Sequence, residues 1–161
     1  MLGMIFVLIY LILFLSALSY AGVFLLSNLL PEWAEQMRMV FSNMIVGGFG
    51  GCTYCLRAVY LNKCVFNRWD NNWLIWYVIR PFVSCICGGV SYLFLKSGLI
   101  FLESGTQQNA TDIGFYALAF VSGLNVDKFI GKIEDIAQAV WGIEKTGSYE
   151  RKAKEKQDSQ P

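Results

Sequence analysis

The chain has 161 residues, of which 55% are hydrophobic, 16% aromatic and only 16% charged, and its formal net charge is +1. Globular chains average about 25% charged residues, and here the charges are segregated, because residues 1–31 carry none. An uncharged apolar run longer than about 18 residues is typical of a membrane-spanning helix. This excludes a soluble domain and predicts an all-α integral membrane protein.

The first apolar segment covers residues 4–30, and we expect it to be a spanning helix. The alternative is a cleaved signal peptide, since small residues near Ser19 and Ala21 would suit a cleavage site. Two features oppose cleavage. No Lys or Arg precedes the apolar run, and the run is longer than the usual h-region of about 7 to 15 residues.

A second span is predicted over residues 32–60. Pro31 suits the first turn of a new helix, because its missing amide hydrogen would have no partner there. Arg38 and Arg57 then mark the two ends of an apolar run about 28 Å long at the helical rise per residue. That length matches a hydrocarbon core of about 30 Å.

The third span is predicted over residues 78–102 and a fourth over 112–126. In the third, Arg80 and Lys96 are about 24 Å apart along a helix. The fourth has only about 21 Å of apolar helix, which is typical of re-entrant, interfacial or bundle-buried elements.

Loop charges predict the orientation. Four basic residues and one acidic residue lie between Arg57 and Arg80, and seven of the thirteen basic residues follow Val126. By the positive-inside rule, both regions and both termini are expected in the cytoplasm. Four spans fit this pattern, whereas a three-span alternative would place the Lys-rich tail on the opposite side. We therefore expect a four-span domain over 1–126.

The second and third spans contain rows of small residues, which let helix backbones approach closely. Gly47 and Gly51 form a GxxxG motif, and Ser84 and Gly88 are also four apart. Helix packing is expected either within the chain or between copies. The alternatives are that the glycines line a pore or act as a hinge, whereas a nucleotide loop is excluded because neither phosphate-binding glycine motif is present. The full set of predicted packing residues is Gly47, Gly48, Gly50, Gly51, Ser84, Gly88 and Gly89.

The chain offers little for catalysis or metal binding. Cys52 and Cys55 have CxxC spacing, but the sequence contains no His and no second CxxC, so no metal, cofactor or catalytic residue is predicted. A small proton-coupled transporter would need an acidic residue inside the membrane, and the nearest are Asp112 and Asp127 at the rims of the fourth segment.

Aromatic and amphipathic stretches lie on the predicted cytoplasmic side. Trp73 and Trp76 precede Arg80 and Pro81, which predicts an aromatic belt or an elbow where an interfacial helix enters the third span. Residues 127–145 show a helical apolar stripe with mixed charges, which favours self-assembly or a soluble partner over lipid alone. The stripe residues expected to dock that partner are Phe129, Ile130, Ile133, Ile136, Val140 and Trp141. Residues 146–161 are Lys, Glu and Gln-rich and are expected to be a disordered tail.

Residues 80–98 (RPFVSCICGGVSYLFLKSG) and 114–130 (GFYALAFVSGLNVDKFI) resemble small four-span bacterial inner-membrane proteins. The matching positions are Arg80, Pro81, Gly88, Tyr92, Gly98 and Gly123. Some of these proteins are similar to membrane components of anti-phage defence systems, the Kiwa membrane subunit among them. The resemblance implies a homo-oligomer that works with a cytoplasmic partner, and it carries no catalytic residue.

Together these features predict a non-enzymatic, oligomeric sensor or scaffold of the bacterial inner membrane, possessing no cofactor. Its expected partners are membrane lipids, further copies of the chain, with a tetramer as the expected size, and a soluble cytoplasmic effector. No direct nucleic-acid binding is expected. The alternatives are a homo-oligomeric ion channel or holin-like pore and a small transporter.

Overall fold

A computed structural model describes residues 2–27, 37–65, 73–97 and 112–142, and these residues are helical almost throughout. The elements are α1 (Leu2–Leu26), α3 (Arg38–Tyr60), the π-helical turn η1 (Leu61–Val65), α4 (Leu74–Lys96), α5 (Asp112–Leu124) and α6 (Val126–Trp141). Several predicted boundaries lie outside the described residues: the end of the first span, the start of the second, the end of the third, and the end of the amphipathic helix at 143–145. The predicted tail at 146–161 also lies outside them.

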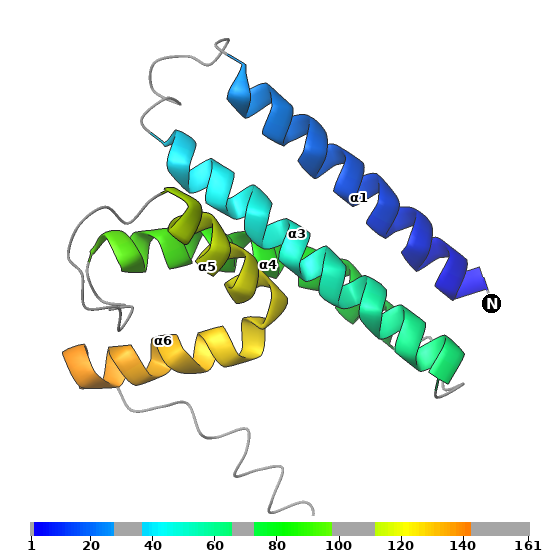
Figure 1. Ribbon diagram of the computed structural model, residues 1–161. Coiled ribbons are helices and arrows are strands. Elements are labelled where there is room, and N and C mark those ends of the chain that lie inside the picture. The colour runs from blue at the N-terminus through cyan, green and yellow to red at the C-terminus, as the bar shows by residue number, and fades with distance from the viewer. Residues whose placement is uncertain (1, 28–36, 66–72, 98–111, 143–161) are drawn as a thin grey trace, which may run out of the picture. The chain divides into compact units, whose positions relative to one another are not determined.

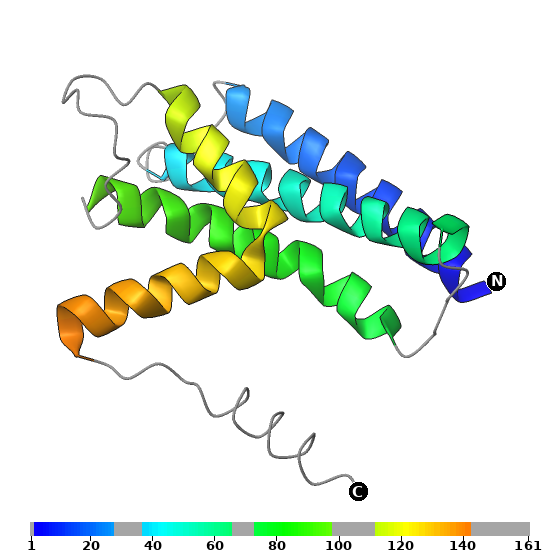
Figure 2. The same ribbon diagram turned by 60° about the horizontal axis from the view of Figure 1, so that its bottom comes forward.

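The chain divides into two units, Met1–Val126 and Asp127–Pro161. The first unit holds α1, α3, α4 and α5, and α6 belongs to the second apart from its first residue. Within the first unit α3 is central, because it contacts α1, α4 and α5. Both views show α1 running alongside α3, with α5 on another side of the same helix (Figures 1 and 2).

Within the described part of the chain, three helices are long and apolar enough to cross a membrane: Gly3–Leu26, Arg38–Val65 and Leu74–Lys96. The broken pair Ile113–Leu124 and Val126–Trp141 raises this number to four if the pair is counted as one span. The prediction of an all-helical protein is confirmed for the described residues, whereas the predicted number of four spans is reached only if this pair is one span.

The start of α4 differs from the prediction. The helix begins at Leu74, four residues before the expected boundary, and continues through Pro81 to Lys96. Arg80 and Pro81 therefore lie inside the helix and do not form an elbow at its entry. A proline usually kinks or ends a helix, but Pro81 does not end α4.

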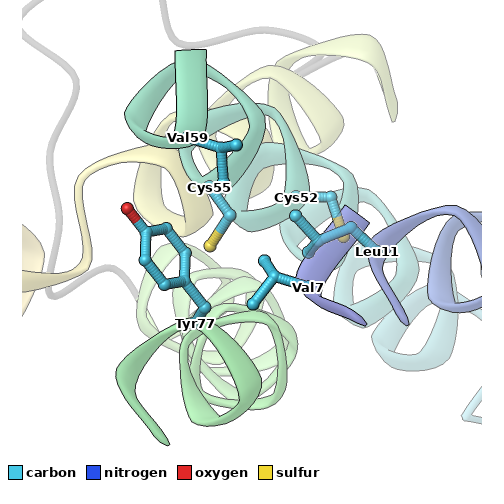
Figure 3. Close-up of a cluster of buried hydrophobic side chains, with 6 residues drawn as sticks. All are labelled: Val7, Leu11, Cys52, Cys55, Val59 and Tyr77. Atoms are coloured by element: carbon cyan, nitrogen blue, oxygen red, sulfur yellow. The ribbon is translucent and has the colours of Figure 1, made fainter. Parts of the chain in front are cut away.

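The apolar core of the first unit lies where α1, α3 and α4 meet. Its buried side chains are Val7, Leu11, Cys52, Cys55, Val59 and Tyr77, and Figure 3 shows them converging from the three helices. Small thiols on α3 let α1 approach, because buried cysteine packs as a small hydrophobe. The hydroxyl of Tyr10 donates to the carbonyl of Val78 at 3.0 Å, which ties α1 to α4 at the same level.

Candidate functional site: the glycine junction of α3, α4 and α5

The backbones of α3 and α4 touch where their small residues meet. A methyl carbon on Gly47 would lie 2.6 Å from the carbonyl oxygen of Ser84 and 2.7 Å from the Cα of Gly88. A methyl carbon on Gly88 would overlap the carbonyl oxygen of Asn43. Carbon atoms in contact are about 3.5–4.0 Å apart, so neither position has room for a side chain. The predicted small-residue rows pack against each other within one chain.

The flanking glycines contact side chains more than backbone. A methyl carbon on Gly48 would lie 2.6 Å from the Sγ of Cys85 and 2.9 Å from a methyl group of Leu18, and one on Gly89 would lie 2.7 Å from the Cγ of Met44. A flexible side chain can move aside more cheaply than a backbone can. We therefore expect Gly47 and Gly88 to tolerate a side chain least among the glycines of the α3–α4 contact.

The third helix of the junction is α5, which packs on the face of α3 that carries Gly50. A methyl carbon on Gly50 would overlap the carbonyl oxygen of Phe120 and would lie 2.9 Å from the amide of Leu124. A methyl carbon on Gly123 would overlap the carbonyl of Gly47. We define the glycine junction by the residues whose backbones meet here: Gly47, Gly50, Gly51, Ser84, Gly88 and Gly123.

Ser84 links α4 to α5 with a hydrogen bond. Its hydroxyl lies 2.9 Å from the carbonyl of Gly123 and 2.9 Å from that of Arg80, one turn earlier in α4. Gly51 must lack a side chain because a methyl group there would overlap Ser84. Carbonyls in the last turn of a helix have no amide donor within that helix, so Ser84 caps the end of α5.

The end of α5 lies at about half the depth of the bundle. Near the start of α5, Tyr116 contacts the sulfur of Met39 at 3.7 Å, close to the start of α3. Its last turn meets Gly47, which is about 14 Å along α3, and Ser84, which is about 15 Å along α4 at the helical rise per residue. Thus α5 covers one half of the α3–α4 pair, consistent with its predicted shortness.

Buried polar groups surround the junction. Asn43 is fully buried, and its side-chain amide donates to the carbonyl of Met39 at 2.7 Å. Its Oδ1 has no hydrogen-bond partner within the described part of the chain. Ser91 and Ser122 are also buried, and each donates to a carbonyl of its own helix. Ser84 differs from these two serines because its hydroxyl reaches a neighbouring helix.

One turn before Ser84 in α4, aromatic rings pack against Arg80. Its guanidinium carbon lies 4.8 Å from the ring centroid of Tyr54 and 5.3 Å from that of Trp76, and only 6% of the residue is exposed. Such cation–π contacts are worth about 0.5–2 kcal/mol each. Tyr77 accepts a hydrogen bond from the Asn62 side chain at 2.9 Å, which joins η1 to this cluster. Trp76 therefore packs inside the bundle, whereas Trp73 is exposed.

The cysteines of the described residues form no disulfide. Cys52, Cys55 and Cys87 are buried, Cys85 is half-buried and Cys64 is exposed. Among the described residues there is no group of three or more His, Cys, Asp or Glu side chains that could hold a metal ion.

The predicted docking stripe lies on α6, in the second unit. Phe129, Ile133 and Ile136 are half-buried. Ile130, Val140 and Trp141 are exposed. The structure thus separates the predicted packing residues, which meet in the first unit, from the docking residues, which lie in the second.

Sequence reasoning did not place Gly123, Asn43 and Tyr54 among the site residues. A signal for Gly123 is present, because Ala119 and Gly123 are four apart and form the same small-xxx-small pattern as the other two helices. Asn43 lies one turn before Gly47, where a buried amide has no distinctive pattern.

Comparison with family models, with curated proteins and with solved structures gave no match.

Proposed function

We propose that this chain is a non-enzymatic sensor or scaffold of the bacterial inner membrane, which assembles with further copies and signals to a cytoplasmic effector through α6. The proposal takes α5 as the short fourth membrane segment, with α6 and both termini in the cytoplasm. The excess of basic residues between Arg57 and Arg80 and after Val126 supports this orientation.

The single observation that carries the proposal is that the closely packed small residues lie in the first unit, whereas the amphipathic helix α6 lies in the second. The first unit uses its small residues to bind its own helices together, as the contacts of Gly47 and Gly123 show. The second unit carries an amphipathic helix that leaves Val140 and Trp141 exposed. A helix with such a stripe lowers its free energy by burying it against another protein.

A second candidate is an ion channel formed by several copies. It is favoured by α5, because a helix that stops at half depth is tolerated where it is buried in protein or lines a cavity. The glycine rows themselves do not favour it, since Gly47, Gly51 and Gly88 are buried against neighbouring helices of the same chain. A conduction path would have to be lined by other residues.

Co-expression with the genomic neighbours tests the proposal. The detergent-purified complex is weighed by native mass spectrometry, and a neighbour-encoded soluble protein is expected in a fixed ratio to a defined oligomer. Ile133→Asp should release that protein, whereas Gln138→Asp, which adds the same charge on the polar side of α6, should retain it. If both variants bind it equally, α6 is not the docking surface.

The channel candidate predicts a different result from the same preparation. In that case no neighbour binds, and liposomes that contain the purified oligomer release potassium. The resemblance alone assigns the process to anti-phage defence, so plaque counts on cells that carry the operon, with and without Ile133→Asp, test that part separately. Equal plaque counts would remove defence from the proposal and leave the scaffold.

A further inference from the structure

The connection between α5 and α6 is one residue long. The first helix ends at Leu124 and the second begins at Val126, so Asn125 alone separates them. The amide of Asn125 donates to the carbonyl of Val121 at 3.0 Å, and Val126 is only 2% exposed. The chain therefore enters α6 directly from the buried end of α5.

That end of α5 is held by both packing and hydrogen bonding. Gly50 and Gly123 bring the backbones of α3 and α5 into direct contact, and Ser84 of α4 donates to the carbonyl of Gly123. A displacement of Leu124 must disturb these contacts, because it follows Gly123 directly and lies against Gly50. Closely packed interiors transmit such strain rather than absorb it.

The hydroxyl of Ser84 has one hydrogen and two carbonyl acceptors at the same distance. The carbonyl of Gly123 is 2.9 Å away and that of Arg80 is also 2.9 Å away. If α5 moves off, the hydroxyl can turn fully to Arg80 and keeps a hydrogen bond. Opening the junction thus costs one bond on the α5 side and leaves no buried donor unpaired on α4. Two discrete arrangements of this kind are the basis of a switch.

We propose that Ser84 is a latch on the α5–α6 connection, so that a protein bound to α6 acts through Asn125 on Gly123 and shifts the balance between latched and released α5. This inference rests on the proposed function, in which α6 is the docking element, and it adds the route by which docking reaches the membrane bundle. Ser84 acts here by positioning α5.

Hydrogen exchange on the full-length protein in nanodiscs tests the latch. Replacing Ser84 by Ala removes the hydroxyl without adding volume, and loss of one hydrogen bond of about 1 kcal/mol should make the amides at 120–124 exchange about fivefold faster. Ser91→Ala is the matched control, since that buried hydroxyl bonds only within α4. Equal exchange in the two variants would overturn the latch.

An antibody fragment raised against a peptide of residues 126–141 tests the coupling without any natural effector. Its binding to the wild-type protein should change exchange at 120–124, and a Gly-Ser-Gly-Ser insertion after Asn125 should abolish that change while the fragment still binds. No change in the wild type, or the same change in the insertion variant, would refute the coupling. Because the fragment replaces the effector, the outcome is independent of whether a natural partner is found.

Discussion

A single methyl group at Gly123 should separate α5 from α3. In Gly123→Ala, the new carbon would overlap the carbonyl oxygen of Gly47 and would lie 2.6 Å from its carbonyl carbon and 2.8 Å from its Cα. Carbon atoms in contact are about 3.5–4.0 Å apart, so α5 must retreat by about 1 Å. The obstacle is backbone on both sides, which cannot rotate out of the way.

Three contributions set the size of the effect. Overpacking a well-filled interior costs about 1–3 kcal/mol. The retreat of α5 also weakens the hydrogen bond from Ser84 to Gly123, which contributes about 1 kcal/mol. Alanine is favoured over glycine inside a helix by about 1 kcal/mol, which opposes these losses. The free energy of unfolding should therefore fall by about 1–3 kcal/mol.

Reversible unfolding in mixed detergent micelles, followed by circular dichroism, measures this change. The matched control is Gly114→Ala in the same helix, where a methyl group would meet nothing within 4 Å. That variant should be neutral or more stable by up to about 1 kcal/mol. If the two variants unfold alike, then α5 does not pack on α3 through Gly123 and the glycine junction is wrong.

Three further results are expected. Gly51→Ala should lower the free energy of unfolding by about 1–3 kcal/mol, since its methyl group would overlap Ser84. Gly131→Ala in α6, where a methyl group would meet nothing within 4 Å, should raise the free energy of unfolding by up to about 1 kcal/mol in the same unfolding experiment. An impermeant maleimide should modify exposed Cys64 well before buried Cys52 and only from the cytoplasmic side, as intact-mass analysis of cells and inverted vesicles will show. Arg80→Lys should cost about 1 kcal/mol, because an ammonium group loses the planar stacking on the rings, and tryptophan fluorescence should shift.

The glycine rows show what the sequence could predict about helix packing and what it could not. GxxxG spacing correctly indicated close packing of the second and third spans, because the absence of side chains is a local property of each helix. It could not tell whether the partner lies in the same chain or in another copy, since the pattern describes one surface only. The structure answers this for Gly47 and Gly88, which face each other within one chain.

The fourth segment and the start of α4 show where local patterns fail. The shortness of α5 was predicted from its apolar length, but its stopping depth depends on contacts with Gly50 and Ser84 that no local pattern contains. The elbow predicted at Arg80 and Pro81 is not formed, because α4 runs without a break from Leu74 through Pro81. Arg80 was predicted from the spacing of charges to mark one end of the third span, and its packing against Tyr54 and Trp76 comes from contacts between helices that this spacing does not contain.

The glycines of the junction already pack against helices of the same chain. Association between copies must therefore use other residues. Helix α1 exposes large apolar side chains such as Ile12, Leu13 and Val23, but lipid tails are as apolar as leucine, so their exposure alone gives no drive to associate inside a bilayer. On the proposed topology the stripe of α6 faces water, where burial of apolar surface is favourable. Self-association and effector binding would then use the same helix. On the proposed coupling, binding of either kind would act on Gly123 through Asn125.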